Sequence, residues 1–234
     1  MSTIADSPAA PVAKERIYIW QFPVRLVHWV IFFSFIILSV TGYYIGDPFI
    51  SVSGPAKEHF VMGTMRAVHL YTAIVFSLAV LVRIYWFFAG NRFARLTDFI
   101  PLRRQRWRGL WRTFLYYCFL RPHPEVYPGH DALAALSYAF VFLIYLLLIA
   151  TGLALYTVVA SFGSPFQVFD FLVPLFGGLQ MARLIHHICM YVVLIFAVIH
   201  IYSVVLWSMI EDSGEVDSIF NGHKFWPKRK GGGA

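Results

Sequence analysis

The sequence predicts an all-α integral membrane protein: a four-helix bundle with an interfacial amphipathic helix between the second and third spans. Three observations support this fold class. Of the 234 residues, 59% are hydrophobic and only 13% are charged, whereas a soluble domain is about half apolar and a quarter charged. Four apolar runs are long enough to cross a bilayer, which takes about 20 residues. A basic, tryptophan-containing stretch lies between the second and third runs.

The expected spans are taken from the apolar runs and cover about residues 24–45, 62–89, 132–156 and 181–209. A further apolar stretch, 161–177, is interrupted by prolines, an aspartate and a glycine pair. We therefore expect it to be an interfacial segment rather than a fifth span. We expect residues 1–234 to form a single membrane domain.

Lysine and arginine predict the orientation. Loops 46–61 and 157–180 contain only Lys57, whereas both termini are basic, and the segment between spans two and three holds Arg92, Arg95, Arg103, Arg104, Arg106, Arg108, Arg112 and Arg121. Cytoplasmic loops carry the excess of Lys and Arg. We therefore expect a multi-pass protein of the cell inner (cytoplasmic) membrane with both termini in the cytoplasm.

The arginine-rich segment contains "RRQRWRGLWRTFLYYCFL". Trp107, Trp111 and Phe114 recur there at helical spacing, which predicts an amphipathic helix on anionic lipid headgroups. A basic run can also bind nucleic acid. Four spans beside it favour membrane lipid as the partner and argue against nucleic acid.

Histidine is the unusual residue of the spans. Five of the nine histidines fall within them: His28, His69, His186, His187 and His200. The others fall in predicted loops: His59, His123, His130 and His223. Ionisable residues at membrane depth are costly and usually functional. A lone histidine could be a neutral imidazole bonded to a neighbouring helix, but five together favour a shared function.

Helical geometry separates these histidines. His186 and His200 are 14 positions apart, which places them about 40° apart in azimuth and about 21 Å apart in depth. His187 and His200 point about 140° away from each other. His186 and His200 therefore share one face of the fourth span, and His187 does not.

Topology then pairs the histidines by depth. Span one enters from the cytoplasm, so His28 lies near the inner surface, and His200 lies toward the same side. Spans two and four enter from outside, so His69 and His186 lie near the outer surface. We expect the outer pair His69/His186 and the inner pair His28/His200.

Haem fits two such pairs, because a six-coordinate haem takes two axial histidines and slots between the helices of a bundle. Zinc fits less well, because a zinc site needs three or four ligands that converge on one point. A proton relay usually recruits carboxylates, which the body of the spans lacks. No C-x-x-C-H motif is present for covalent haem attachment. The expected cofactors are two haem b groups, which would conduct electrons across the bilayer.

Four further residues are candidate haem contacts. Gly42 and Gly152 lie in matching "TG" dipeptides level with the outer pair, where a small residue would let a flat macrocycle approach. Such glycines also serve ordinary helix packing in membranes. Arg66 and Arg25 lie one turn from His69 and His28, and each could bind haem propionates or extend to headgroups.

The residues also resemble a known family. The stretches "FPVRLVHW", "TGYYIGDPFISVSGPA", "MGTMRAVHLYTA", "RIYWFFAGNRFAR", "GHDALAALSYAF" and "TGLALY", with the His186…His200 pair, are similar to the b-type cytochrome subunit of membrane-bound [NiFe] uptake hydrogenases. The likeness runs from about residue 20 to 225. The four-histidine pattern alone is shared with formate dehydrogenase gamma subunits.

The resemblance implies the partners and the reaction. The partners would be the hydrogenase small and large subunits on the outer face, assembled into a higher-order oligomer of the complex. Electrons from H₂ would reach the outer haem, then the inner haem, and reduce quinone. The family ligands map onto His28, His69, His186 and His200. The chain would have no catalytic residue of its own and would act only within a hydrogen:quinone oxidoreductase complex.

Two alternatives stay open. The chain could be the haem b subunit of another dehydrogenase, such as formate dehydrogenase, or of a ferric reductase. It could also be a passive membrane anchor or a small transporter without haem, in which the histidines are structural. The lack of Asp and Glu in the spans counts against an ion-coupled transporter.

Overall fold

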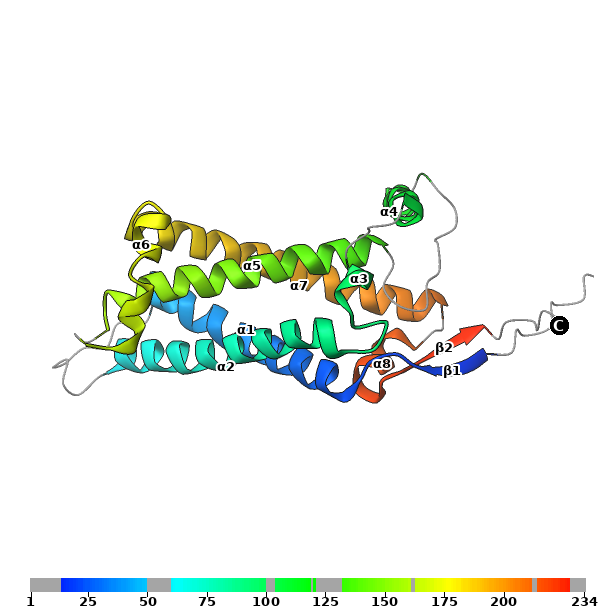
Figure 1. The fold of residues 1–234 in the computed structure, drawn as a ribbon, viewed down its shortest axis with the longest axis horizontal. Coiled ribbons are helices and arrows are strands. Elements are labelled where there is room, and N and C mark those ends of the chain that lie inside the picture. The colour runs from blue at the N-terminus through cyan, green and yellow to red at the C-terminus, as the bar shows by residue number, and fades with distance from the viewer. Residues whose placement is uncertain are drawn as a thin grey trace, which may run out of the picture.

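Four long helices dominate the structure, a computed structural model that describes residues 14–49, 60–99, 104–118, 120, 132–160, 163–211 and 214–227. These are α1 (Phe22–Gly46), α2 (Val61–Ala89), α5 (Ala132–Thr157) and α7 (Leu179–Glu211) (Figure 1). All four are long and apolar enough to cross a membrane. These four helices coincide with the predicted spans, with bounds that differ by at most two residues.

The bundle consists of two helical hairpins packed together. α1 packs along α2, and α5 packs along α7. Val27 and Ile31 of α1 meet Phe76 and Val80 of α2 in one core cluster. A second core cluster joins α1, α5 and α7. In it, Phe35 of α1 packs with Leu148 of α5 and with three residues of α7: Cys189, Met190 and Val193.

Outside these clusters the bundle exposes an apolar surface. Phe88 of α2 and Val198 of α7 are each 70% exposed, and Leu143 of α5 is 64% exposed. A helix that is hydrophobic all round requires a hydrophobic environment. The chain is therefore an all-α integral membrane bundle.

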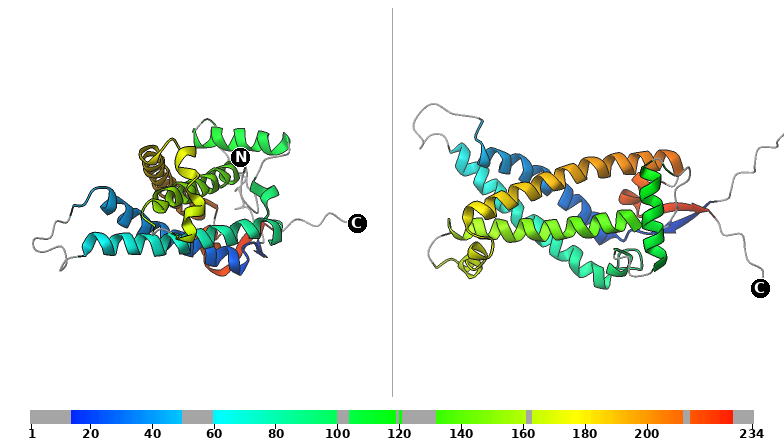
Figure 2. Two further views of the ribbon diagram at one scale, coloured as in Figure 1. Left: turned by 60° about the vertical axis from the view of Figure 1, so that its left-hand side comes forward. Right: turned by 90° about the horizontal axis from the view of Figure 1, so that it is seen from above.

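Short elements lie at the two ends of the bundle. They are α3 (Leu96–Phe99), α4 (Arg104–Tyr117), η2 (Pro165–Phe169), α6 (Leu172–Leu175) and α8 (Glu215–Asn221). The helix predicted from the basic stretch is α4. It lies across the long helices, near one end of α5 and α7 (Figure 2); its contact with headgroups stays a prediction. In the described part of the stretch 161–177, residues 163–177, the helices are η2 and α6, which are too short to span a membrane.

A two-stranded sheet is the element that the all-α prediction missed. β1 (Lys14–Tyr18) pairs antiparallel with β2 (His223–Pro227), with Tyr18 opposite His223. The backbone amides of Ile19 and Trp20 both donate to the Gly222 carbonyl. His223 therefore lies in a strand, whereas the sequence placed it in a loop. His59, His123 and His130 lie outside the described residues.

The ends of the bundle differ in composition. The sheet, α3 and α4 lie at one end, and η2 and α6 at the other (Figure 1). The described basic residues of both termini, such as Arg16 and Lys224, are thus at the same end as the arginine-rich α4. Several charges used for the orientation lie outside the described residues: Lys57, Arg103, Arg121, Lys228, Arg229 and Lys230.

Candidate functional site

Four of the five histidines in the spans form two pairs inside the bundle. The imidazoles of His69 on α2 and His186 on α7 have ring centroids 6.5 Å apart and planes tilted by 58°. Those of His28 on α1 and His200 on α7 are 6.4 Å apart and tilted by 56°. All four are half-buried. These are the pairs expected from depth, and α7 supplies one member of each.

The separation within each pair fits two imidazoles on opposite sides of one metal ion. A metal–imidazole nitrogen bond is about 2.0–2.1 Å long. A ring nitrogen lies roughly 1.1 Å from the centroid of its own ring, so two trans-axial imidazoles have centroids about 6.3 Å apart. Both observed separations, 6.5 and 6.4 Å, lie close to this value. The spacing within each pair is therefore compatible with one iron ion between the two rings.

The outer pair is fixed by the same contact on both sides. Thr41 Oγ1 lies 2.9 Å from His69 Nδ1, and Thr151 Oγ1 lies 2.9 Å from His186 Nδ1. The glycines that follow these threonines contact the same rings. A Cβ at Gly42 would lie 3.1 Å from His69 Cε1, and one at Gly152 would lie 3.4 Å from His186 Cε1. The two expected glycines thus make room for the histidine rings.

The inner pair has a different environment. Tyr138 of α5 lies with its hydroxyl 3.2 Å from His200 Nδ1. Phe196 stacks on the His200 ring at 5.6 Å. Nδ1 of His28 is buried and has no hydrogen-bond partner among the described residues. The two pairs therefore share their spacing but not their surroundings.

The two expected arginines have different environments. Arg25 donates from its guanidinium to the Phe220 carbonyl at the end of α8, so this group anchors the carboxyl-terminal segment to α1. Arg66 is exposed on the surface of α2. Neither arrangement tests binding to a haem propionate, which stays a prediction for both residues.

His187 belongs to neither pair but lies beside one of them. Its ring centroid is 6.5 Å from that of His186, with the ring planes 72° apart. Its Nε2 would be 3.3 Å from a Cβ at Gly46 of α1, so the ring also packs against that glycine. Among the described residues, no three or more His, Cys, Asp or Glu side chains converge to hold a metal ion. The donor set is thus two nitrogens per site, which suits haem better than zinc.

The sequence did not single out four polar residues of the spans. Thr41 and Thr151 precede the two noted glycines, so the repeated "TG" was the available signal. Tyr138 had no distinguishing pattern. Arg83 is only 6% exposed; it donates to the Ala94 carbonyl at 3.3 Å and lies 4.3 Å from the Phe87 ring centroid.

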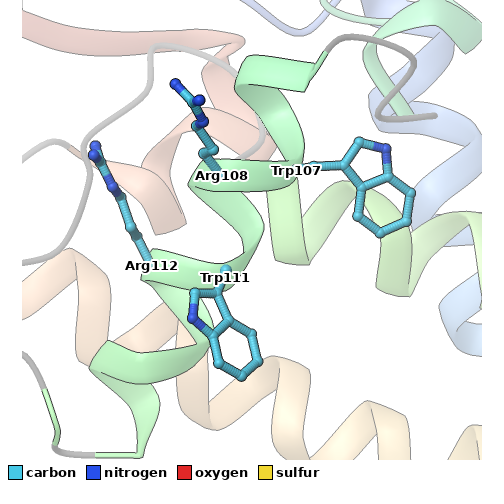
Figure 3. Close-up of a pocket in the computed structure, with 4 residues that line it drawn as sticks. All are labelled: Trp107, Arg108, Trp111 and Arg112. Atoms are coloured by element: carbon cyan, nitrogen blue, oxygen red, sulfur yellow. The ribbon is translucent and has the colours of Figure 1, made fainter.

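A second candidate surface lies on α4. An open hollow of about 330 Å³ is lined by Trp107, Arg108, Trp111 and Arg112. Figure 3 shows the two arginines pointing away from the two indole rings. Trp107 is 56% and Trp111 59% exposed, while Thr113 on the opposite face is buried. This separation of apolar and cationic groups is typical of helices at a membrane surface.

Comparisons with known proteins identify the family. Residues 19–222 match the family model described as prokaryotic cytochrome b561. The chain is 35% identical to the probable Ni/Fe-hydrogenase B-type cytochrome subunit of Azotobacter chroococcum mcd 1, with 81% of this chain and 80% of the relative covered.

Two further relatives have comparable coverage. The probable Ni/Fe-hydrogenase 1 B-type cytochrome subunit of Escherichia coli K12 is 34% identical, with 89% of this chain and 92% of the relative covered. The probable Ni/Fe-hydrogenase B-type cytochrome subunit of Rhodobacter capsulatus is 35% identical, with 90% and 82% covered. The chain therefore belongs to the prokaryotic cytochrome b561 family, a family of haem b electron-transfer proteins, and it resembles the hydrogenase cytochromes within it.

Proposed function

We propose that this chain is the di-haem membrane subunit that passes electrons from a periplasmic [NiFe] hydrogenase to quinone. The outer haem b is held by His69 and His186, and the inner haem b by His28 and His200. The hydrogenase small and large subunits bind at the η2/α6 end of the bundle. Quinone is reduced toward the other end, where the terminal sheet lies.

One observation carries the proposal: two imidazole pairs, each with the centroid separation of a trans-axial pair, at two depths of one bundle. In each pair the two histidines come from different helices, and α7 contributes one histidine to both pairs. The names of the relatives support the choice of partner, since all of those given above are Ni/Fe-hydrogenase cytochrome subunits. They favour hydrogenase over formate dehydrogenase as the electron donor.

The protein's contribution is position and ligation. When bound, each haem b supplies a reversible one-electron iron couple. His186 and His200 are 14 positions apart on one continuous helix, which separates the two ligand levels by about 21 Å along the helix axis. Because α7 supplies a ligand to both levels, it fixes their separation and keeps both between the two hairpins.

The orientation follows from the charges. The described part of the η2/α6 end has few Lys and Arg, whereas β1, β2 and α4 at the other end are basic. Because the basic end is expected in the cytoplasm, the His69/His186 level faces outward. This places the first electron acceptor on the side of the proposed periplasmic partner.

Replacing His200 tests the ligand assignment. We expect the full-length wild-type chain, purified from its membrane, to contain two haem b groups. The His200→Ala variant should contain about one, and membranes that hold this variant together with the hydrogenase should lose hydrogen-dependent quinone reduction. His187→Ala is the matched control, because His187 is a histidine of the same helix outside both pairs, and it should retain both haems. The measurement is pyridine haemochrome content per chain.

Three results would contradict the proposal at different levels. Unchanged haem content in His200→Ala would reject this residue as a ligand. A reduced-minus-oxidised spectrum of the wild type without an α band would reject the haem subunit altogether and favour a passive anchor or transporter. Loss of haem in His187→Ala but not in His186→Ala would move the outer site to the neighbouring histidine.

A further inference from the structure

We infer that Thr41 and Thr151 are positioning residues that set the tautomer and the ring orientation of the two outer histidines. The inference rests on the proposed function, because it takes His69 and His186 as iron ligands. The two threonines stand in matching hairpins. Thr41 of α1 contacts His69 of α2, and Thr151 of α5 contacts His186 of α7, both at 2.9 Å.

The direction of these hydrogen bonds follows from a count of protons. A threonine hydroxyl has one proton to donate and lone pairs with which to accept. Thr41 Oγ1 donates to the Ile37 carbonyl at 2.7 Å, and Thr151 Oγ1 donates to the Leu147 carbonyl at 2.7 Å. With its proton used within its own helix, each hydroxyl can only accept from the imidazole. Nδ1 of each histidine is therefore the protonated nitrogen.

A second backbone carbonyl within reach of each hydroxyl supports the same tautomer. Thr41 Oγ1 lies 3.3 Å from the Leu38 carbonyl, and Thr151 Oγ1 lies 3.2 Å from the Leu148 carbonyl. A carbonyl oxygen can only accept, so the hydroxyl proton stays within the helix. Nδ1 then carries the imidazole proton, which leaves Nε2 as the nitrogen with a free lone pair.

A histidine held in this way is prepared to bind a metal. Ligating histidines usually donate their second ring N–H to an acceptor, which fixes the ring and raises the basicity of the ligating nitrogen. At the outer pair a threonine is that acceptor on both sides. The adjacent glycine completes the device, since a side chain at Gly42 would approach His69 Cε1 to 3.1 Å. The threonine hydroxyl forms a hydrogen bond with the histidine ring, and the glycine has no side chain that would clash with the ring in this position.

The inner pair lacks this arrangement. His200 Nδ1 faces the Tyr138 hydroxyl at 3.2 Å, and His28 Nδ1 has no hydrogen-bond partner among the described residues. The threonines should therefore influence the outer site alone. This selectivity separates a positioning role from a general effect on the fold.

The test is a redox titration of Thr151→Val in the full-length chain, with the low-spin ferric EPR spectrum as a second readout. Valine keeps the shape and removes the acceptor, so Nε2 becomes less basic and ferric iron is bound less tightly. We expect the ferric-over-ferrous affinity ratio of one haem to fall about tenfold, which raises its midpoint potential by about 59 mV. The other haem should be unchanged. The EPR g values of the affected haem should shift, because the 58° angle between the ring planes is no longer fixed.

Three variants make the result decisive. Thr151→Ser restores the hydroxyl and should restore the potential. Thr157→Val is the matched control, because Thr157 is a buried threonine of the same helix whose hydroxyl donates to the Ala154 carbonyl; it should leave both potentials unchanged. Thr41→Val repeats the experiment from the other hairpin if Thr151→Val fails to assemble, and it should affect the same haem.

Unchanged potentials and EPR spectra in both valine variants would overturn the inference. So would an equal shift in Thr151→Ser, which retains the acceptor. These outcomes differ from failure of the proposed function, in which the wild-type chain itself binds no haem or His186→Ala binds as much haem as the wild type.

Discussion

Replacing Gly42 with alanine would test whether the outer histidines depend on the space left by glycine. The added Cβ would lie 3.1 Å from His69 Cε1. Carbon atoms in comfortable contact are about 3.5–4.0 Å apart, so the ring must move by roughly 0.4–0.9 Å. The Thr41–His69 hydrogen bond is 2.9 Å long, and N–H···O bonds usually measure about 2.7–3.2 Å. A shift of this size should therefore weaken or break the bond.

The expected magnitude follows from that bond. A typical intramolecular hydrogen bond contributes about 1 kcal/mol, which corresponds to roughly a fivefold loss of affinity for the outer haem. The Ala substitution also favours the helix by about 1 kcal/mol. Haem affinity should thus fall while the stability of the haem-free fold does not, a combination that general damage to the structure would not produce.

Two other glycines give a graded control. A Cβ at Gly152 would lie 3.4 Å from His186 Cε1, and one at Gly63 would lie 3.9 Å from the Phe60 ring, which takes no part in either pair. We expect the loss of haem affinity to decrease from Gly42→Ala to Gly152→Ala and to vanish in Gly63→Ala. The assay is haem titration of the haem-free full-length chain, followed at the Soret band. Equal affinities in all three variants would refute the steric reasoning.

Two further predictions concern the ends of the bundle. The exposed Cys118, just past α4, should react with a membrane-impermeant maleimide in inside-out vesicles and not in right-side-out ones. Because Cys189 is buried, the control variant Cys118→Ser should not be labelled. Labelling of Cys118 in right-side-out vesicles would reverse the proposed orientation. Replacing Arg108 and Arg112 together with glutamine should weaken binding of the purified chain to anionic lipid nanodiscs severalfold at low salt, measured against the wild type; equal binding would show that the hollow on α4 is not a headgroup site.

The spans and the histidine pairing could be predicted from the sequence because both depend on regular geometry. A membrane helix has a fixed rise and turn per residue, so positions along it convert directly into depth and azimuth. This was sufficient to separate His186 from His187 and to pair each remaining histidine with one at its own level.

Contacts between segments far apart in the chain could not be predicted in the same way. Tyr18 and His223 are paired across the terminal sheet, but each strand is only five residues long and carries little local signal. Arg25 was expected near haem or headgroups because only its neighbours in sequence were known. Its contact with the Phe220 carbonyl depends on where α8 folds back, which no local pattern specifies.

The two hairpins also share a spacing that explains why their two histidine levels differ. Thr41 and Thr151 occupy corresponding places, as do His69 and His186. On the first helix of each hairpin, the residue 13 positions before the threonine is His28 in one hairpin and Tyr138 in the other. On the second helix, the residue 14 positions after the outer histidine is Arg83 in one hairpin and His200 in the other.

At the outer level the corresponding residues of the two hairpins are therefore the same, and the pair is symmetric. At the inner level they differ: one hairpin offers a histidine on its first helix, and the other offers a histidine on its second. Tyr138 and Arg83 fill the two places left over, and Tyr138 contacts His200. A substitution in either "TG" dipeptide should thus change the same haem, the outer one, in the same direction. The two inner ligands have different surroundings, so each must be tested separately.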